Sequence, residues 1–291
     1  MAVKCFQDIF LLSVLCFGVA SYSLPLSTQG RWIVDSSSGR RVKLACTCWP
    51  SHMKPMLAEG LHKKPLKDIV AKVVLQKFNC VRLTWATYML TRYSNNTVTQ
   101  TFDNLHLAQA KQGIAQNNPA LLNMTHVQAF EALVDELGRQ GLMVVLDNHV
   151  SNPKWFCAEE DGNGFFGDAD FNPLEWERGL VAVAQQFSRL NYATDLSFLK
   201  NPVGLRPNFD NMLVYEAHWY SWSVHTDTCV DTSNVVYDHS LFFQDGDQAV
   251  PLFLSEFGFD QTGSNETDNV FINCFLTAAA KYDLSWSLWA L

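Results

Sequence analysis

Short apolar runs alternate along the chain with longer stretches that are apolar on one side only. The strand-like runs cover residues 31–35, 42–46, 80–85, 142–146, 212–217, 250–255 and 284–291. Between them, apolar residues recur every three or four positions, as on one face of a helix, within residues 66–78, 130–137, 173–188 and 268–282. Buried strands that alternate with amphipathic helices predict a parallel sheet covered by helices.

Local signals indicate where two of these helices begin. Thr125 and Gln128 have the spacing of a capping box, in which each residue satisfies a backbone N–H of the other. Asn172 is a favoured N-cap residue, Pro173 suits the first helical position, and Glu175 completes a second box. Both predicted helices therefore have defined starting points.

Other segments carry no helical stripe. The runs 31–35 and 42–46 flank a turn rich in serine and glycine, so they are interpreted as two short strands across that turn. The polar stretch 94–118 is predicted to be a loop. The chain contains no internal repeat, low-complexity segment or linker, so residues 24–291 are predicted to form a single domain, although 291 residues would also fit two small ones.

Polar and aromatic side chains collect just after the predicted strands. They are Arg82, Asp147, His149, His218, Tyr220, Glu256 and Trp289. In a (β/α)₈ barrel, the residues at the C-terminal ends of the strands form the active site. The sequence therefore predicts an α/β fold of the TIM-barrel class with a site built from these residues.

Composition and the first residues restrict partners and location. The formal net charge of −8 disfavours nucleic acid and anionic membranes as partners and leaves neutral substrates open. Residues 1–23 place Lys4 before an apolar run and then small residues, which is the layout of a secretory signal peptide. The apolar run is short for a membrane span; a buried helix or an uncleaved anchor are the alternatives. We expect a secreted protein, extracellular or in the cell wall, without stable membrane association after cleavage.

Two further features agree with secretion. Acceptor sequons for N-glycosylation occur at Asn95, Asn123 and Asn265. An even number of cysteines follows residue 23, as expected for disulfides in an oxidising compartment, but their pairing is not readable: Cys46, Cys48, Cys80, Cys157, Cys229 and Cys274. None of them shows zinc-type spacing.

The strand-end motifs together resemble glycoside hydrolase family 5, the cellulase-like TIM barrels, and most closely its secreted plant members. The matching stretches are RWIVD at 31–35, FNCVRLTW at 78–85, VVLDNHVS at 144–151, LNYATDLSFLKN at 190–201, EAHWYSW at 216–222, PLFLSEFG at 251–258 and LSWSLWAL at 284–291. The resemblance implies a monomeric hydrolase that cleaves O-glycosyl bonds of a β-linked polysaccharide or glycoside by a retaining mechanism, without a cofactor.

The resemblance also implies a role for each site residue. Glu256 would be the nucleophile, Arg82 would hold it, and His218 and Tyr220 would contact both the nucleophile and the sugar. Substrate contacts would come from His149, Trp222 and Trp289. The physical reasons are independent of the family: a nearby cation keeps a carboxylate ionised, and a tyrosine could donate to one carboxylate oxygen and leave the other free to attack.

Several of these residues have alternative interpretations. Arg82 could pair with a core carboxylate, and a structural role is favoured over catalysis for Asp147. Asp147, His149 and His218 could also suggest a metal hydrolase, but the sequence has neither an H-E-x-x-H nor an H-x-H pattern, so no metal is predicted. Four further residues could either pack or line subsites: Thr84, Trp85, Trp219 and Trp222.

The main discrepancy with the family is that the expected second catalytic carboxylate is absent. In the family, the acid/base is the glutamate of an Asn-Glu pair at the end of the fourth strand, and the only such pair here is Asn265-Glu266. No apolar strand lies between Phe187 and Leu190, so the fourth strand, its helix and most of the fifth strand are expected to be missing near 188/189. The final helix is also expected to be missing.

An incomplete barrel opens two further interpretations. Glu216 could replace the missing acid, although a buried structural carboxylate held by Arg82 or a neighbour is favoured for it. Weaker candidates are Glu159, Glu160 and Asp161. The alternative to an enzyme is a catalytically dead carbohydrate-binding or vestigial variant.

Overall fold

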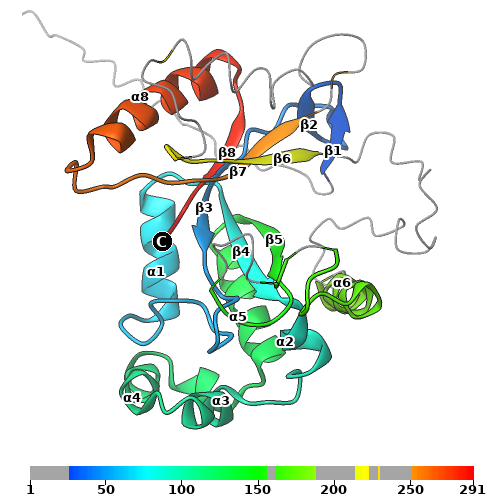
Figure 1. Cartoon of the computed structure of the whole chain (residues 1–291), viewed down its shortest axis with the longest axis vertical. Helices are drawn as coiled ribbons and strands as arrows, with labels where there is room; N and C mark the ends of the chain where they lie inside the picture. Colours follow the sequence, from blue (N-terminus) through cyan, green and yellow to red (C-terminus); the bar gives the residue numbers. More distant parts are fainter. Residues whose placement is uncertain are drawn as a thin grey trace, which may run out of the picture.

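A computed structural model of the chain describes residues 26–155, 162–164, 166–187, 214–222, 229, 249 and 251–291. Its centre is a curled parallel sheet with strand order β5-β4-β3-β8-β7-β6 (Figure 1). The strands are β3 (Ala45–Trp49), β4 (Cys80–Ala86), β5 (Met143–Val150), β6 (Tyr215–Trp219), β7 (Leu252–Phe257) and β8 (Ser285–Leu288). This matches the predicted parallel sheet.

Helices follow the strands in the predicted alternation. They are α1 (Leu66–Leu75), α5 (His126–Arg139), α6 (Pro173–Phe187) and α8 (Glu266–Lys281). The predicted capping box at the start of α5 is confirmed, because Thr125 Oγ1 accepts from the Gln128 N–H while the Gln128 side chain accepts from the Thr125 N–H. At α6, Asn172 Oδ1 accepts from the Glu175 N–H at 3.0 Å, but the Glu175 carboxylate binds Arg92 instead of completing a box.

The sheet and helices form an incomplete (β/α)₈ barrel. Among the described residues, β5 and β6 are the two ends of the six-stranded sheet, and a closed eight-stranded barrel would have two more strands between them. The predicted omission near 188/189 falls between these strands in the sequence and lies outside the described residues. β6 follows in the sixth barrel position, so that β7 and β8 lead back to β3.

The prediction of a loop over residues 94–118 is wrong. After α2 (Thr87–Thr91), the segment contains α3 (Val98–Asn104) and α4 (Ala108–Asn117), followed by the 3₁₀ helix η1 (Pro119–Asn123). α3 begins at a capping box of Thr97 and Gln100. α4 buries Ile114 alone, so its sequence carries no apolar stripe, and it is held in place by contacts with the turn before α1.

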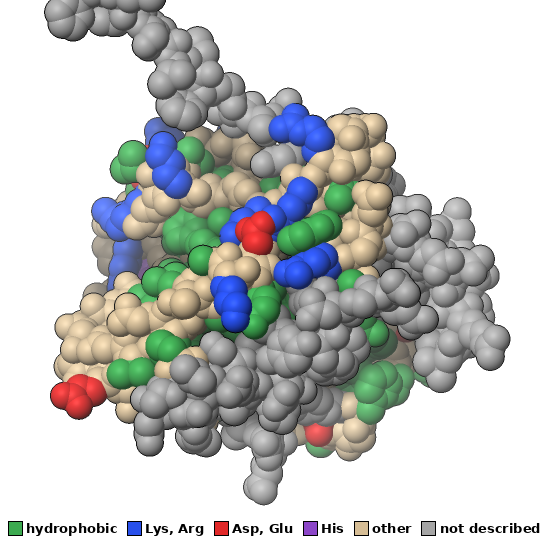
Figure 2. Space-filling view, turned by 90° about the horizontal axis from the view of Figure 1, so that it is seen from above, with side chains coloured by type: hydrophobic (Ala, Val, Ile, Leu, Met, Phe, Trp, Pro, Cys, Tyr) green, Lys and Arg blue, Asp and Glu red, His purple; other side chains and the backbone are tan. Residues whose placement is uncertain are grey.

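The N-terminal hairpin also differs from its prediction. β2 (Trp32–Asp35) confirms the run 31–35, but its partner is β1 (Leu26–Gln29), and the expected second strand, 42–46, begins instead at Ala45 as barrel strand β3. The predicted strands are joined by a hydrogen bond from the Val42 N–H to the Ile33 carbonyl oxygen, next to an isolated bridge between Val34 and Arg41, but 42–46 does not pair with β2 as a strand. Arg41 and Lys43 then pair with Asp283 after α8. On the face seen in Figure 2, Lys and Arg side chains gather around an acidic side chain.

Apolar clusters and disulfides hold the barrel together. One cluster packs α1 and α5 against β4, and another packs α8 against β7 and β8. The disulfide Cys46–Cys80 joins β3 to β4 at paired positions, and Cys229–Cys274 attaches Cys229 to α8. Cys48 is a buried free thiol in the described part of the chain.

Candidate active site

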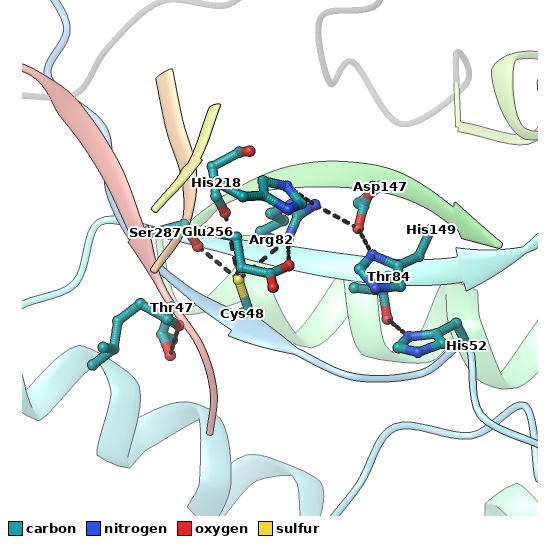
Figure 3. A network of polar contacts seen from close by, with 12 residues as sticks. Thr47, Cys48, His52, Arg82, Thr84, Asp147, His149, His218, Glu256 and Ser287 are labelled. Atoms are coloured by element: carbon teal, nitrogen blue, oxygen red, sulfur yellow. Dashed lines mark hydrogen bonds and ion pairs between the residues drawn. The ribbon is translucent and has the colours of Figure 1, made fainter. Parts of the chain in front are cut away.

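The predicted site residues come from several strands of the sheet and meet around Arg82. Arg82 comes from β4, Asp147 and His149 from β5, His218 from β6 and Glu256 from β7 (Figure 3). Because side chains alternate between the two faces of a strand, Asp147 and His149 point to the same side. The strand register brings His218 directly opposite Glu256.

Arg82 is the centre of the arrangement. Its Nη1 lies 2.8 Å from Glu256 Oε2 and its Nη2 lies 3.1 Å from Asp147 Oδ2, so one guanidinium bridges two carboxylates. His218 Nε2 lies 3.5 Å from the same Nη2. Arg82 is buried, which would lower its pKa, but the negative charges of Asp147 and Glu256 outweigh burial and raise the pKa. The side chain therefore stays cationic.

Glu256 receives a donor on each carboxylate oxygen. Tyr220 Oη donates to Oε1 at 2.6 Å, while Arg82 occupies Oε2. The sequence suggested that the second oxygen would be free to attack, but Arg82 binds it. Each carboxylate oxygen still retains a further lone pair. Burial, and then the Glu256 charge, raise the pKa of Tyr220, so the hydroxyl remains a donor.

Gly258 allows this close approach. A Cβ at this position would lie 3.0 Å from the Trp289 carbonyl oxygen and 3.1 Å from Cε1 of Tyr220. The glycine that ends the SEFG motif therefore lets the chain after β7 pack directly against two site residues. The SEFG motif thus supplies the carboxylate of Glu256, and its glycine leaves room for Trp289 and Tyr220.

Asp147 connects Arg82 to His149. Its Oδ2 also accepts from His149 Nδ1 at 2.9 Å, which assigns the Nδ1 proton and leaves the Nε2 atom of His149 as an acceptor when the ring is neutral. Burial would raise the pKa of Asp147, but Arg82 and His149 together lower it. Asp147 is consequently an ionised carboxylate that orients its neighbours, in agreement with its predicted structural role.

Two residues of this network were not predicted. Cys48 is paired in register with Arg82, and its Sγ lies 3.0 Å from Ser287 Oγ and 3.6 Å from Arg82 Nη1. Burial raises the pKa of Cys48 to about 11, so it is a neutral thiol. His52 Nδ1 lies 2.7 Å from Thr84 Oγ1, and burial lowers the pKa of His52 to about 3. Both are neutral neighbours of a highly charged group.

A sequence signal for Cys48 does exist. Cys46 and Cys48 are two residues apart on β3, and Cys80 and Arg82 have the same spacing on β4. Once the Cys46–Cys80 disulfide fixes the register, the next inward-facing pair is Cys48 beside Arg82. For His52, no sequence signal separates it from any other loop histidine.

Aromatic rings line one side of the site. The His149 ring stacks on Trp289 with centroids 5.4 Å apart and an interplanar angle of 15°, and His52 lies 4.3 Å from His149. Trp222 is 63% exposed and stacks on Tyr220. These rings offer apolar faces beside polar groups, which suits the faces of a sugar ring.

The structure also answers which of the ambiguous residues pack. Trp219 is buried against Phe275 of α8, so it belongs to the core rather than to a subsite. Trp85 and Thr84 are buried too, and Thr84 Oγ1 accepts from the Ser51 N–H. Trp222 alone among these four is exposed.

Glu216 does not have its favoured role as a buried carboxylate. It is exposed on β6, and the carboxylates that pair with Arg82 in the described part of the chain are Asp147 and Glu256. Asp147 and Glu256 lie nearer to Arg82 than Glu216 does, and they already compensate its positive charge. The weaker candidates 159–161 lie outside the described residues, as do residues 1–23 and Cys157.

Several other features bear on the predictions. Asn95, Asn123 and Asn265 are all exposed. Within the described residues, no group of three or more His, Cys, Asp or Glu side chains could hold a metal ion. No helix in the same part of the chain is both long and apolar enough to cross a membrane.

Two solved cellulase structures have a similar fold. The chain is similar to the catalytic domain of the major endoglucanase from Xanthomonas campestris pv. campestris, with a TM-score of 0.70 and 16% sequence identity over 91% of this chain and 90% of that one. An endocellulase from Pyrococcus horikoshii in complex with cellotetraose gives a TM-score of 0.68 at 14% identity, over 92% and 91% of the two chains. The described fold is that of a cellulase-type barrel.

A sequence relative specifies the family. A glycosyl hydrolase 5 family protein from Chamaecyparis obtusa is 40% identical over 338 residues, covering 96% of this chain, and no family model matches. The chain is therefore a relative of the glycoside hydrolase family 5 proteins and spans 60% of the length of that relative. The alignment is 47 residues longer than the chain, so the relative contains residues inside the aligned stretch that this chain lacks.

Proposed function

We propose that this chain is a glycoside hydrolase of the retaining type, with Glu256 as its nucleophile and a β-linked glycan as its substrate. The observation that carries the proposal is the carboxylate of Glu256 at the strand end, with Tyr220 on one oxygen and Arg82 on the other. The cellotetraose bound to the structurally similar endocellulase supports a glycan as substrate. Sugar contacts would come from His149, Trp222 and Trp289.

The acid/base residue is proposed to be absent. Glu266, in the only Asn-Glu pair, is exposed in the first turn of α8. Asp147 is ionised and has no proton to donate, because its pKa is lowered. The family 5 relative contains residues within the aligned stretch that this chain lacks. This difference supports an internal omission in this chain, which we place near 188/189.

These assignments predict a chain that performs half of a retaining reaction. In the first half, a Glu256 oxygen forms a bond to the anomeric carbon while the bond to the leaving oxygen breaks and its electron pair leaves with it. A 2,4-dinitrophenolate leaving group is a stable anion and needs no proton. In the second half, water must lose a proton to a base as it attacks, and this chain would lack that base.

Pre-steady-state kinetics with 2,4-dinitrophenyl β-cellobioside and β-mannoside test the proposal. We expect a burst of about one dinitrophenolate per chain, a covalent glycosyl adduct on Glu256 by mass spectrometry, and a very slow second phase that azide accelerates. Glu256→Ala should abolish the burst. Glu216→Gln is the matched control, since Glu216 is an exposed carboxylate on the neighbouring strand, and it should leave the burst unchanged.

Other results would overturn specific parts of the proposal. Steady turnover of unactivated oligosaccharides would contradict the absence of an acid/base, and its loss in Glu216→Gln would identify Glu216 as the acid. A folded chain that binds oligosaccharides but shows no burst would favour the non-catalytic carbohydrate-binding alternative.

We also propose that the chain is a secreted monomeric glycoprotein. The signal-like residues 1–23, the three exposed sequon asparagines and the disulfides Cys46–Cys80 and Cys229–Cys274 support this location. After expression in a secretory host, the protein should be found in the culture medium with its N-terminus after residue 23. It should lose mass on treatment with peptide-N-glycosidase. Retention of the chain in the cytosol with an intact N-terminus would contradict it.

A further inference from the structure

A surface groove lies apart from the proposed active site, between α4 and the turn that precedes α1. It has a cavity volume of about 510 Å³ and is lined by His62, Lys63, Gln109, Ala110, Gln112, Gly113 and Gln116. Cavities of about 300 to 1,000 Å³ are typical of small-molecule sites in proteins. α4 lies beyond the C-terminal ends of β3 and β4 (Figure 1).

The backbones of α4 and of the turn approach closely at one small residue of the groove. A Cβ at Gly113 would lie 2.2 Å from the His62 carbonyl oxygen, so only glycine fits against the turn. Gly113 and Ala110 are the two small residues of the lining. The close approach of α4 to this turn is therefore set by the backbone.

Side-chain amides fix the two walls relative to each other. Asn117 Nδ2 donates to the His62 carbonyl at 3.1 Å, and Asn118 Nδ2 donates to the carbonyls of Leu61 and Lys64. Asn118 Oδ1 also accepts from the Leu66 N–H at 2.8 Å, which links it to the first residue of α1. A groove with preformed walls loses less conformational entropy when a ligand binds.

The chemistry of the lining suits a neutral, hydroxyl-rich ligand. Gln109, Gln112 and Gln116 follow one face of α4, and each amide presents both donors and an acceptor, as sugar hydroxyls require. Gln109 and Gln116 are seven positions apart, which is about 10 Å along the helix axis and comparable to two sugar rings. The lining contains no carboxylate, one lysine and no large apolar side chain, so it suits neither a cationic nor a lipid-like ligand.

We infer that this groove is a second binding site for a neutral oligosaccharide, separate from the site around Glu256. It holds the glycan through the glutamine amides and His62, without an aromatic platform. Its affinity is consequently weak, in the millimolar range, and its occupancy requires no chemistry at the catalytic residues.

NMR titration of the full chain with cellohexaose and mannohexaose tests this inference. The side-chain amide signals of Gln109, Gln112 and Gln116 should shift and saturate at millimolar oligosaccharide. In Gln112→Ala/Gln116→Ala, the remaining groove signals should respond at least tenfold more weakly, while the shift of the Trp289 indole N–H stays as in the unmodified chain. Gln76→Ala, which removes an exposed glutamine at the end of α1, is the matched control and should change neither response.

Either of two results would overturn the inference. One is a set of α4 amide signals that does not move with neutral oligosaccharide. The other is a response to acidic oligogalacturonate alone, which would assign the groove to anion binding at Lys63. Because the groove and the indole of Trp289 are observed separately, failure here is distinguishable from failure of the proposed hydrolase function.

Discussion

Tyr220 donates a hydrogen bond of 2.6 Å to Oε1 of Glu256, the carboxylate oxygen that Arg82 does not occupy. A hydrogen bond to a charged group contributes about 1.5 to 3 kcal/mol. We therefore expect Tyr220→Phe to slow the dinitrophenolate burst about 10- to 100-fold without preventing folding. Stopped-flow absorbance measures this rate directly.

The pH dependence separates a positioning role of Tyr220 from proton transfer. Because the pKa of Tyr220 is raised by burial and by Glu256, its hydroxyl stays protonated in neutral and mildly alkaline solution. The alkaline limb of the burst rate should be the same in the unmodified chain and in Tyr220→Phe. Tyr282→Phe, at the end of α8, controls for loss of a hydroxyl elsewhere, and an unchanged rate in Tyr220→Phe would contradict the role.

Removal of Arg82 should destabilise the fold as well as the site. Arg82→Met leaves Glu256 and Asp147 without their shared counter-ion, and breaking a buried ion pair in this way costs about 3 to 5 kcal/mol. Urea unfolding followed by fluorescence should show this loss. Arg139→Met is the matched control: the Arg139 side chain is 68% exposed in its pair with Glu136, so less than about 1 kcal/mol is expected. Equal effects of the two substitutions would contradict the buried network.

Asp147 should make the fold sensitive to strong acid. Its pKa is lowered in the folded chain, so its contribution to stability is present above the unfolded-state value of about 3.9 and is lost as the pH falls through the folded value. Asp147→Asn should be less stable at neutral pH and should show a flatter dependence of the unfolding free energy below about pH 4. Parallel curves for the two proteins would show that Asp147 is not linked to folding.

His126 should contribute a second, separate pH dependence. Its ring is buried, with Nδ1 donating to the Met56 carbonyl and Nε2 accepting from the Thr101 hydroxyl, and burial lowers its pKa to about 4. A lowered pKa means that the unfolded chain binds the proton first, so stability falls as the pH drops from about 6.5 towards 4.

The effect of His126 on stability is measurable by denaturant unfolding at a series of pH values. Its contribution is about 3 kcal/mol at most, and His52, with its pKa lowered to about 3, adds a term of the same sign. His126→Gln should be less stable at pH 7 and should lose part of the slope between pH 6.5 and 4. An undiminished slope in this variant would contradict a neutral buried imidazole.

The alternation of apolar runs and stripes was sufficient to predict the barrel strands and the helices that cover them. It failed for α4, where Ile114 is the only buried residue and the helix is held by Asn117 and Asn118. It also failed for the partner of β2, because the pairing of short edge strands depends on tertiary contacts that a local pattern does not contain.

For the site, the strand ends predicted which residues meet but not all of their partners. The contacts of Arg82 and Tyr220 with Glu256 were implied by the resemblance to glycoside hydrolase family 5, and the structure contains both. Cys48 was missed because an even number of cysteines suggests disulfides and does not tell which thiol stays free. The buried role expected of Glu216 failed because Asp147 takes the second half of the Arg82 guanidinium.

The guanidinium bridge has a consequence for the covalent intermediate proposed at this site. Once Glu256 is an ester of the sugar, it no longer carries a negative charge, and Arg82 would become a buried cation with half of its partners neutralised. Asp147 remains ionised beside it and keeps the pair compensated throughout. Asp147 is thus the counter-ion that stays charged while Glu256 would lose and regain its charge. The ion pair between Arg82 and Asp147 would remain intact during both changes.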